Sequence, residues 1–118
     1  MLTNKRILTA NYVAETAHVP HQLVAYGDAD DHAKAATGAD GEKLLGATTD
    51  VGAAVGERVD VVLLGPTPVV YGAGVARGDR IKADAQGRAV PAAAGEASIG
   101  DALLSGVVGD IGSVFIGR

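Results

Sequence analysis

The sequence predicts an all-β domain, built as a small β-barrel or β-sandwich, on three observations. A strand–turn–strand pattern occurs twice, over residues 44–65 and again over residues 97–117. All 17 glycines lie at residue 27 or later and interrupt nearly every window that is long enough for a helix. Short apolar runs between turn residues fill the same region. We therefore expect a β domain over residues 23–118, preceded by an extended N-terminal arm over residues 1–22.

The two copies of the repeat align at three places. These are Leu45-Gly46 with Ile99-Gly100, Gly56-Glu57 with Gly109-Asp110, and Leu63-Leu64-Gly65 with Phe115-Ile116-Gly117. The offset falls from 54 (46 to 100) to 52 (65 to 117), as two single-residue deletions would produce. Glycine supplies turn dihedrals and β-branched residues favour strands, so each copy predicts a hairpin. We expect the two hairpins to pair in one sheet or barrel.

The first 20 residues show no sustained period of 2 or 3.6. One interpretation is a disordered tail, since chain termini often lack order. The alternative, which we favour, is an arm that becomes ordered on a neighbouring protein. Its apolar anchors would be Leu2, Ile7, Leu8, Tyr12 and Val13.

The central strands are expected between residues 22 and 71. Residues 22–26 form a short apolar strand that ends at Gly27, and Asp40-Gly41 predicts a hairpin between residues 32–37 and 43–47. The run Val61–Leu64 favours a central strand that is buried on both faces. Gly65–Pro68 is expected to be a turn, because two prolines cannot donate to a ladder.

The segment from residue 80 to residue 90 predicts an exposed hairpin. Ile81 and Ala83 alternate with three charged residues, which places the two apolar side chains inward. Gln86-Gly87 is the expected turn into the returning strand, residues 88–90.

Composition and charge exclude several classes of function. The 118 residues fit one domain, and the absence of cysteine suits a reducing compartment. Net charge is −4, with 4 basic and 7 acidic residues through residue 50 and 6 and 7 afterwards, so no basic face for nucleic acid is expected. The apolar runs are too short to span a membrane. With 3% aromatic residues, the core is expected to be aliphatic.

No catalytic, cofactor or metal site is expected, and the chain does not look like an enzyme. There is no cysteine, no serine in G-x-S-x-G and no histidine after residue 32. The histidines at 18, 21 and 32 lie near the aspartates at 28, 30 and 31, but their spacing favours solvated loops over metal binding. The glycines of Gly72–Gly78 precede a charged strand and not a helix, which favours a turn over a nucleotide site.

An ordered set of motifs between Leu23 and Gly117 resembles the capsid cement, or head decoration, proteins of tailed bacteriophages. The set comprises Leu44-Leu45-Gly46, the segment from Gly52 to Val61, Gly78-Asp79 with the segment from Ala83 to Val90, and Ile99 to Leu103. The resemblance covers about four fifths of the chain and carries no catalytic motif. It implies a structural virion protein that stabilises the capsid.

The resemblance implies partners and a location as well. The partners would be the phage major capsid protein and other copies of the chain, as a trimer in preference to a dimer, with no nucleic acid and no membrane. The arm with Leu2, Ile7, Leu8, Tyr12 and Val13 would lie along the capsid protein. The protein would be made in the host cytoplasm and would end on the outer capsid surface.

Two other functions remain open from the sequence. Duplicated β units also build carrier or ligand-binding modules of lipoyl or biotinyl type, but these place a lysine at a hairpin tip, whereas Lys82 lies mid-strand and Lys43 lacks the flanking residues. An adhesion module would use the tripeptide Arg77-Gly78-Asp79, which a turn before a strand also favours.

Overall fold

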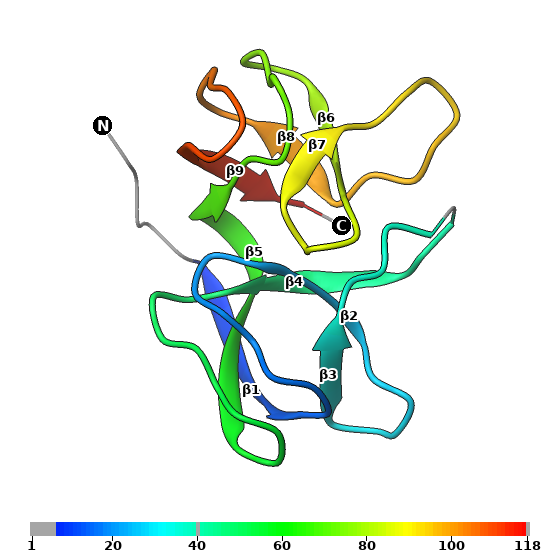
Figure 1. The fold of residues 1–118 in the computed structure, drawn as a ribbon, viewed down its shortest axis with the longest axis vertical. Helices are drawn as coiled ribbons and strands as arrows, with labels where there is room; N and C mark the ends of the chain where they lie inside the picture. The colour runs from blue at the N-terminus through cyan, green and yellow to red at the C-terminus, as the bar shows by residue number, and fades with distance from the viewer. Residues whose placement is uncertain (1–6, 40, 118) are drawn as a thin grey trace.

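A computed structural model describes residues 7–39 and 41–117 and confirms the all-β fold. Within these ranges nine strands occur. They are β1 (Leu8–Ala14), β2 (Leu23–Tyr26), β3 (His32–Ala35), β4 (Leu44–Thr48), β5 (Arg58–Val70), β6 (Arg80–Ala83), β7 (Ala89–Pro91), β8 (Gly100–Ala102) and β9 (Ile111–Ile116). They form two lobes that share β5, which runs from the lower to the upper lobe (Figure 1).

The lower lobe is a closed five-stranded barrel. Its strands follow the order β1-β3-β2-β4-β5, and β1 pairs with β5 to close the ring. Tyr12 of β1 packs against the buried residues that fill it, which are aliphatic: Ala14, Val24, Ala33, Leu45, Val59 and Val61. Small aliphatic side chains suit the narrow interior of a five-stranded barrel.

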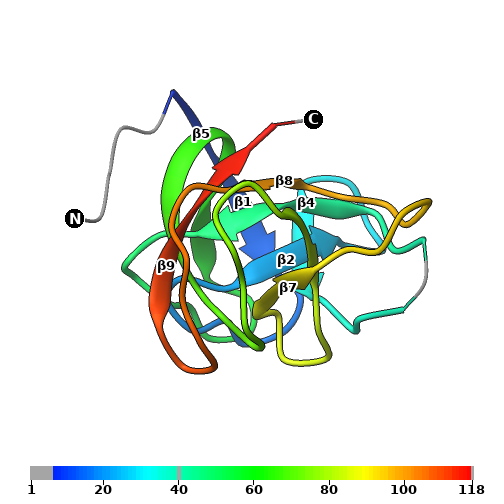
Figure 2. The same cartoon turned by 90° about the horizontal axis from the view of Figure 1, so that it is seen from above.

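The upper lobe is built on the second half of β5. There β5 pairs with β9, followed by β8, β6 and β7. A single parallel bridge between Tyr71 and Ala89 brings β7 back beside the end of β5. Seen from above, β7, β8 and β9 therefore lie around a ring and not in a plane (Figure 2).

Tyr71 occupies the centre of the upper core and is fully buried. Its hydroxyl donates to the Leu104 carbonyl at 2.6 Å and lies 3.3 Å from the Ser113 carbonyl. Burial raises the pKa of Tyr71. The expectation of a purely aliphatic core is thus wrong at this position.

Strand β5 passes through both prolines without a break, so the turn expected at residues 65–68 is wrong. The Val70 amide donates to the His21 carbonyl (3.0 Å), on the edge of β5 away from β9. Residues two apart in a strand direct their backbone groups to the same edge. Pro66 and Pro68 therefore face that edge, where no ladder requires the missing N–H.

Both copies of the sequence repeat form antiparallel strand pairs, which confirms the hairpin repeat. In the first, Ala47 pairs with Val62, and in the second, Ala102 pairs with Val114. Gly46 and Gly100 occupy equivalent positions in the two copies, and at both the partner strand approaches closely. A Cβ at either position would collide with a carbonyl oxygen of the partner strand.

One turn recurs four times in the described part of the chain. Its instances are Ala54–Glu57, Ala76–Asp79, Ala93–Glu96 and Val107–Asp110. In each, the acidic residue donates its amide to the first carbonyl at 3.0 Å, and its carboxylate accepts from the first amide at 2.6–3.0 Å. The third residue is a glycine with φ between +86° and +94°, as a type II turn requires.

The N-terminal boundary expected at residue 22 is corrected for residues 8–14. These residues form β1, which pairs antiparallel with β5 and parallel with β3 inside the lower barrel. Tyr12 and Ala14 pack into its core, while Asn11 is exposed. The inward residues include small alanines, so the period-2 pattern is weak in the sequence.

The remaining strand predictions divide in two. The strand at residues 22–26 and the hairpin of β6 and β7 are confirmed, with Ile81 and Ala83 buried and the turn at Gly87. The hairpin expected around Asp40-Gly41 is wrong, because β3 pairs with β2 and β1, whereas β4 pairs with β2 and β5.

Candidate binding surfaces

The residues predicted for the arm have different surroundings. Ile7 and Leu8 are 65% and 50% exposed. Tyr12 packs against the lower core, and Val13 lies opposite Arg58 of β5 and His32 of β3. Leu2 lies outside the described residues. Ile7 and Leu8 therefore offer the apolar surface at the start of β1.

The histidines and aspartates that were weighed for metal binding do not form a cluster among the described residues. His18 is buried, with its two ring nitrogens 3.3 Å from Gln22 Oε1 and from the Ala33 carbonyl. His32 contacts Glu15 instead, with Nδ1 3.1 Å from Oε1. Across residues 7–39 and 41–117, no group of three or more histidine and acidic side chains is arranged to hold a metal ion.

Glu15 holds the turn between β2 and β3. One carboxylate oxygen accepts from the amides of Asp28 (2.7 Å) and Ala29 (3.1 Å) and contacts His32. The hydrogen bond from Ala29, with help from His32 and Asp28, holds the pKa of Glu15 below its ordinary value. In the same loop, the Asp28 carboxylate accepts a hydrogen bond from Lys34 Nζ at 2.9 Å, which raises the pKa of Lys34. Hydrogen bonds therefore hold the loop between β2 and β3 in place, and the surface at this end of the barrel is highly charged.

Arg77-Gly78-Asp79 is part of the recurring turn. The Asp79 carboxylate accepts from the Ala76 amide at 2.9 Å, and the Arg77 amide donates to Ser105 Oγ at 3.0 Å. The aspartate therefore caps its own turn, as the structural interpretation of this tripeptide requires. The chain then continues into β6 and not into the helix that a nucleotide-binding turn requires.

The two lysines weighed for a carrier function do not lie at a hairpin tip. Lys82 lies within β6, and its ammonium group pairs with the Glu96 carboxylate. Lys82, with the Ala93 amide, lowers the pKa of Glu96. Lys43 directly precedes β4. Lys82 is therefore not at an exposed turn, and Lys43, although exposed, lies in a loop between β3 and β4, which do not pair with each other as a hairpin.

A groove of about 590 Å³ lies between the loop before β4 and the segment before β8. Leu44, Ala83 and Ile99 line it together with the Lys82–Glu96 ion pair. A second hollow continues it past Tyr26, which is 45% exposed. The groove combines an apolar floor with paired charges.

Within the described ranges, no helix has the length and apolarity to cross a membrane.

Comparison with known proteins shows a similarity of fold. No family model and no curated protein sequence matches this chain. Among solved structures, the N base of the head fiber gp8.5 of bacteriophage phi29 is similar, with a TM-score of 0.69 and 21% sequence identity over 94% of both chains. The two chains share one fold. The likeness spans both lobes, so the two-lobed arrangement around β5 is the shared unit.

Proposed function

We propose that this chain is a structural virion protein that binds the outside of a tailed-phage capsid and stabilises it. The observation that carries the proposal is the fold, which matches the base of a phage head fiber along 94% of both chains. The resemblance of its ordered motifs to capsid cement proteins supports the same role from the sequence. In this proposal the chain is not an enzyme and acts only through contacts between proteins.

The partners in this proposal are the major capsid protein and further copies of the chain, as a trimer in preference to a dimer. Ile7 and Leu8, exposed at the start of β1, together with Leu2, would contact the capsid protein. A protein that binds the assembled shell and not its free subunits stabilises the shell by mass action. At a hundredfold excess over Kd the gain is about 2.7 kcal/mol for each site.

The test uses undecorated heads of the phage that encodes the chain. Purified protein is mixed with these heads and separated on a density gradient, and the heads are then heated with and without it. We expect the protein to sediment with the heads and to raise the temperature at which they open. Protein that stays at the top of the gradient at every concentration contradicts the proposal.

A separate variant tests whether Ile7 contributes to binding. Ile7→Asp places a charge on an exposed residue outside the strands, so the barrel should fold normally. We expect weaker binding to heads, whereas Val55→Asp, a change at a residue that is 67% exposed in the turn before β5, should bind as the parent does. Equal binding by both variants removes Ile7 from the contact.

A further inference from the structure

The groove described above has two walls, one from each lobe. The lower wall is the loop before β4, with residues 41–43, and the upper wall is the segment before β8, with residues 95–98. Both walls lie on the same side of the molecule in the two ribbon views (Figure 1 and Figure 2). The first hollow has a volume of about 590 Å³, and the second, of about 690 Å³, continues it to Tyr26. These volumes are within the range of about 300–1,000 Å³ that is typical of small-ligand sites.

Hydrogen bonds within the chain hold the described residues of both walls in place. In the lower wall, the Glu42 carboxylate accepts from the Thr37 amide at 2.8 Å and from the Gly38 amide at 3.2 Å. In the upper wall, the Glu96 carboxylate accepts from the Ala93 amide at 2.7 Å. The groove is therefore formed before any ligand arrives, and binding requires little ordering of the walls.

The lining combines apolar carbon with hydrogen-bonding groups. Leu44, Ala83 and Ile99 line the first hollow. Beside them the Lys82 ammonium group pairs with the Glu96 carboxylate, and these side chains are 31% and 30% exposed. An ammonium group has three donors and a carboxylate has two accepting oxygens, so the pair can form further hydrogen bonds. A ligand in the groove therefore meets donors, acceptors and apolar surface together.

Tyr26 differs from the other two tyrosines in its exposure. Tyr71 is fully buried in the upper core, and Tyr12 packs against the lower core. Tyr26 is 45% exposed at the end of β2 and lines the second hollow. A tyrosine combines an apolar ring with a polar hydroxyl group. The groove therefore has an aromatic side chain at one end.

Peptides, lipids and ions match this lining poorly. A peptide that extends a sheet needs a free strand edge, but β2 pairs with β3 and β4, β4 with β2 and β5, and β6 with β7 and β8. A lipid chain needs an enclosed apolar cavity, whereas this groove is open to solvent and contains an ion pair. A charged ligand would have to compete with that pair, in which each charge already has its partner.

We propose that the groove binds a neutral oligosaccharide. A sugar ring has apolar C–H groups on its faces and hydroxyl groups around it that donate and accept hydrogen bonds, and it carries no charge. One ring lies against Tyr26, and hydroxyl groups further along the oligosaccharide bond to Lys82 and Glu96. The groove does not include Ile7 or Leu8, so this site is independent of the capsid contact in the proposed function.

Nuclear magnetic resonance of the full chain, labelled with nitrogen-15, tests this binding without capsids. The probes are neutral hexasaccharides of glucose, mannose, galactose and N-acetylglucosamine, with a hexasaccharide of galacturonic acid as the charged comparison. We expect at least one neutral probe at millimolar concentration to shift the amide signals of residues 41–44 and 97–99. The ring signals of Tyr26 should shift too, whereas those of Tyr12 and Tyr71 should not, because these rings lie in the cores.

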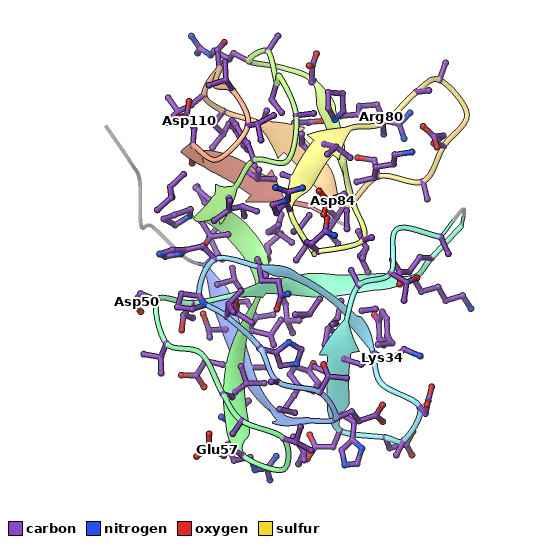
Figure 3. The ribbon with its side chains drawn as sticks, in the orientation of Figure 1. Lys34, Asp50, Glu57, Arg80, Asp84 and Asp110 are labelled. Atoms are coloured by element: carbon purple, nitrogen blue, oxygen red, sulfur yellow. The ribbon has the colours of Figure 1, made fainter. Side chains whose placement is uncertain are left out.

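Matched variants assign the binding to the groove. Tyr26→Ala removes the ring and should weaken binding roughly tenfold, whereas Tyr26→Phe keeps the ring and should weaken it much less. Ala97→Leu fills the groove and should reduce binding, whereas Ala94→Leu places the same side chain in the same exposed segment outside the lining and should not. Val51→Ala is a remote control, because its neighbour Asp50 lies on the side of the molecule opposite the two walls (Figure 3).

Three outcomes overturn the assignment. The first is that no neutral probe shifts any signal, or that the shifts map away from the groove. The second is equal affinity of Ala97→Leu and Ala94→Leu. The third is tighter binding of the galacturonic acid probe than of every neutral one, which would make the ligand an anion. Circular dichroism verifies folding, and the two leucine variants decide the matter if Tyr26→Ala does not fold.

Discussion

At the scale of single residues, the position of Tyr71 depends on two glycines. A Cβ on Gly112 would collide with the Tyr71 ring, and one on Gly106 would lie 2.8 Å from it. We expect Gly112→Ala to lower the free energy of unfolding by about 1–3 kcal/mol, the usual cost of overpacking a core. Urea denaturation measures this. Gly74→Ala is the control, because nothing lies within 4 Å of its added Cβ, and equal stabilities of the two variants would contradict the packing account.

Glu15 predicts a dependence of stability on pH. Its pKa is lowered in the folded protein, so its contribution is complete above the unfolded-state pKa of about 4.3 and is lost as the pH falls through the folded value. We expect Glu15→Gln to lower the urea midpoint at neutral pH and to converge with the parent in acid. Asp50→Asn, at an exposed carboxyl group, is the control. A difference that stays constant with pH would exclude this role for the carboxylate.

At the scale of elements, the recurring turn sets the geometry before β5, β6 and β9. Gly109 has φ +89° and open space around it, so an added Cβ costs only backbone strain. We expect Gly109→Ala and Gly56→Ala each to destabilise the protein by about 1–2 kcal/mol, and Gly109→Asn to cost less. Urea unfolding of the three variants tests this, and an alanine variant as stable as the parent would count against the turn assignment.

The elements that the sequence predicts well are those with strong local signals. The β6–β7 hairpin alternates apolar and charged residues around Gly87. The two copies of the repeat support the same strand–turn–strand prediction for each other. Strand β1 escapes prediction because its inward alanines give little contrast with its outward residues. The two prolines of β5 led to the wrong prediction of a turn. Only the pairing of β5 with β9 shows that the prolines face an edge where no neighbouring strand needs their N–H groups.

The candidate surfaces were less predictable than the strands. Ile7 and Leu8 stand out as apolar residues in the sequence, but only the structure separates them from Tyr12, which fills the chain's own barrel. The pairing of β5 with β9 was not predicted residue by residue. The two strands are more than 40 residues apart in the sequence, and only their register shows that Pro66 lies opposite Phe115 and Val70 opposite Ile111.

At the scale of the whole molecule, β5 and Gln22 join the lobes. The Gln22 amide donates to Thr48 Oγ1 at 2.9 Å in the lower barrel, and its side-chain nitrogen donates to the Gln86 carbonyl at 3.2 Å in the upper lobe. Since the lobes also share a strand, we expect them to unfold together.

Gln22→Ala tests this coupling. We expect it to lower the free energy of unfolding by about 1–2 kcal/mol, because it removes the side-chain hydrogen bonds to His18 and Gln86. The unfolding should remain one transition when followed by circular dichroism and by tyrosine fluorescence. Two separate transitions would show that the lobes are independent.

The proposed function depends on this two-lobed body occupying the outside of a phage shell. Electron cryomicroscopy of undecorated heads mixed with saturating protein measures this most directly. The account predicts regular density on the outer surface into which both lobes and the shared strand fit. Shells that remain bare, or density inside the shell only, would contradict it.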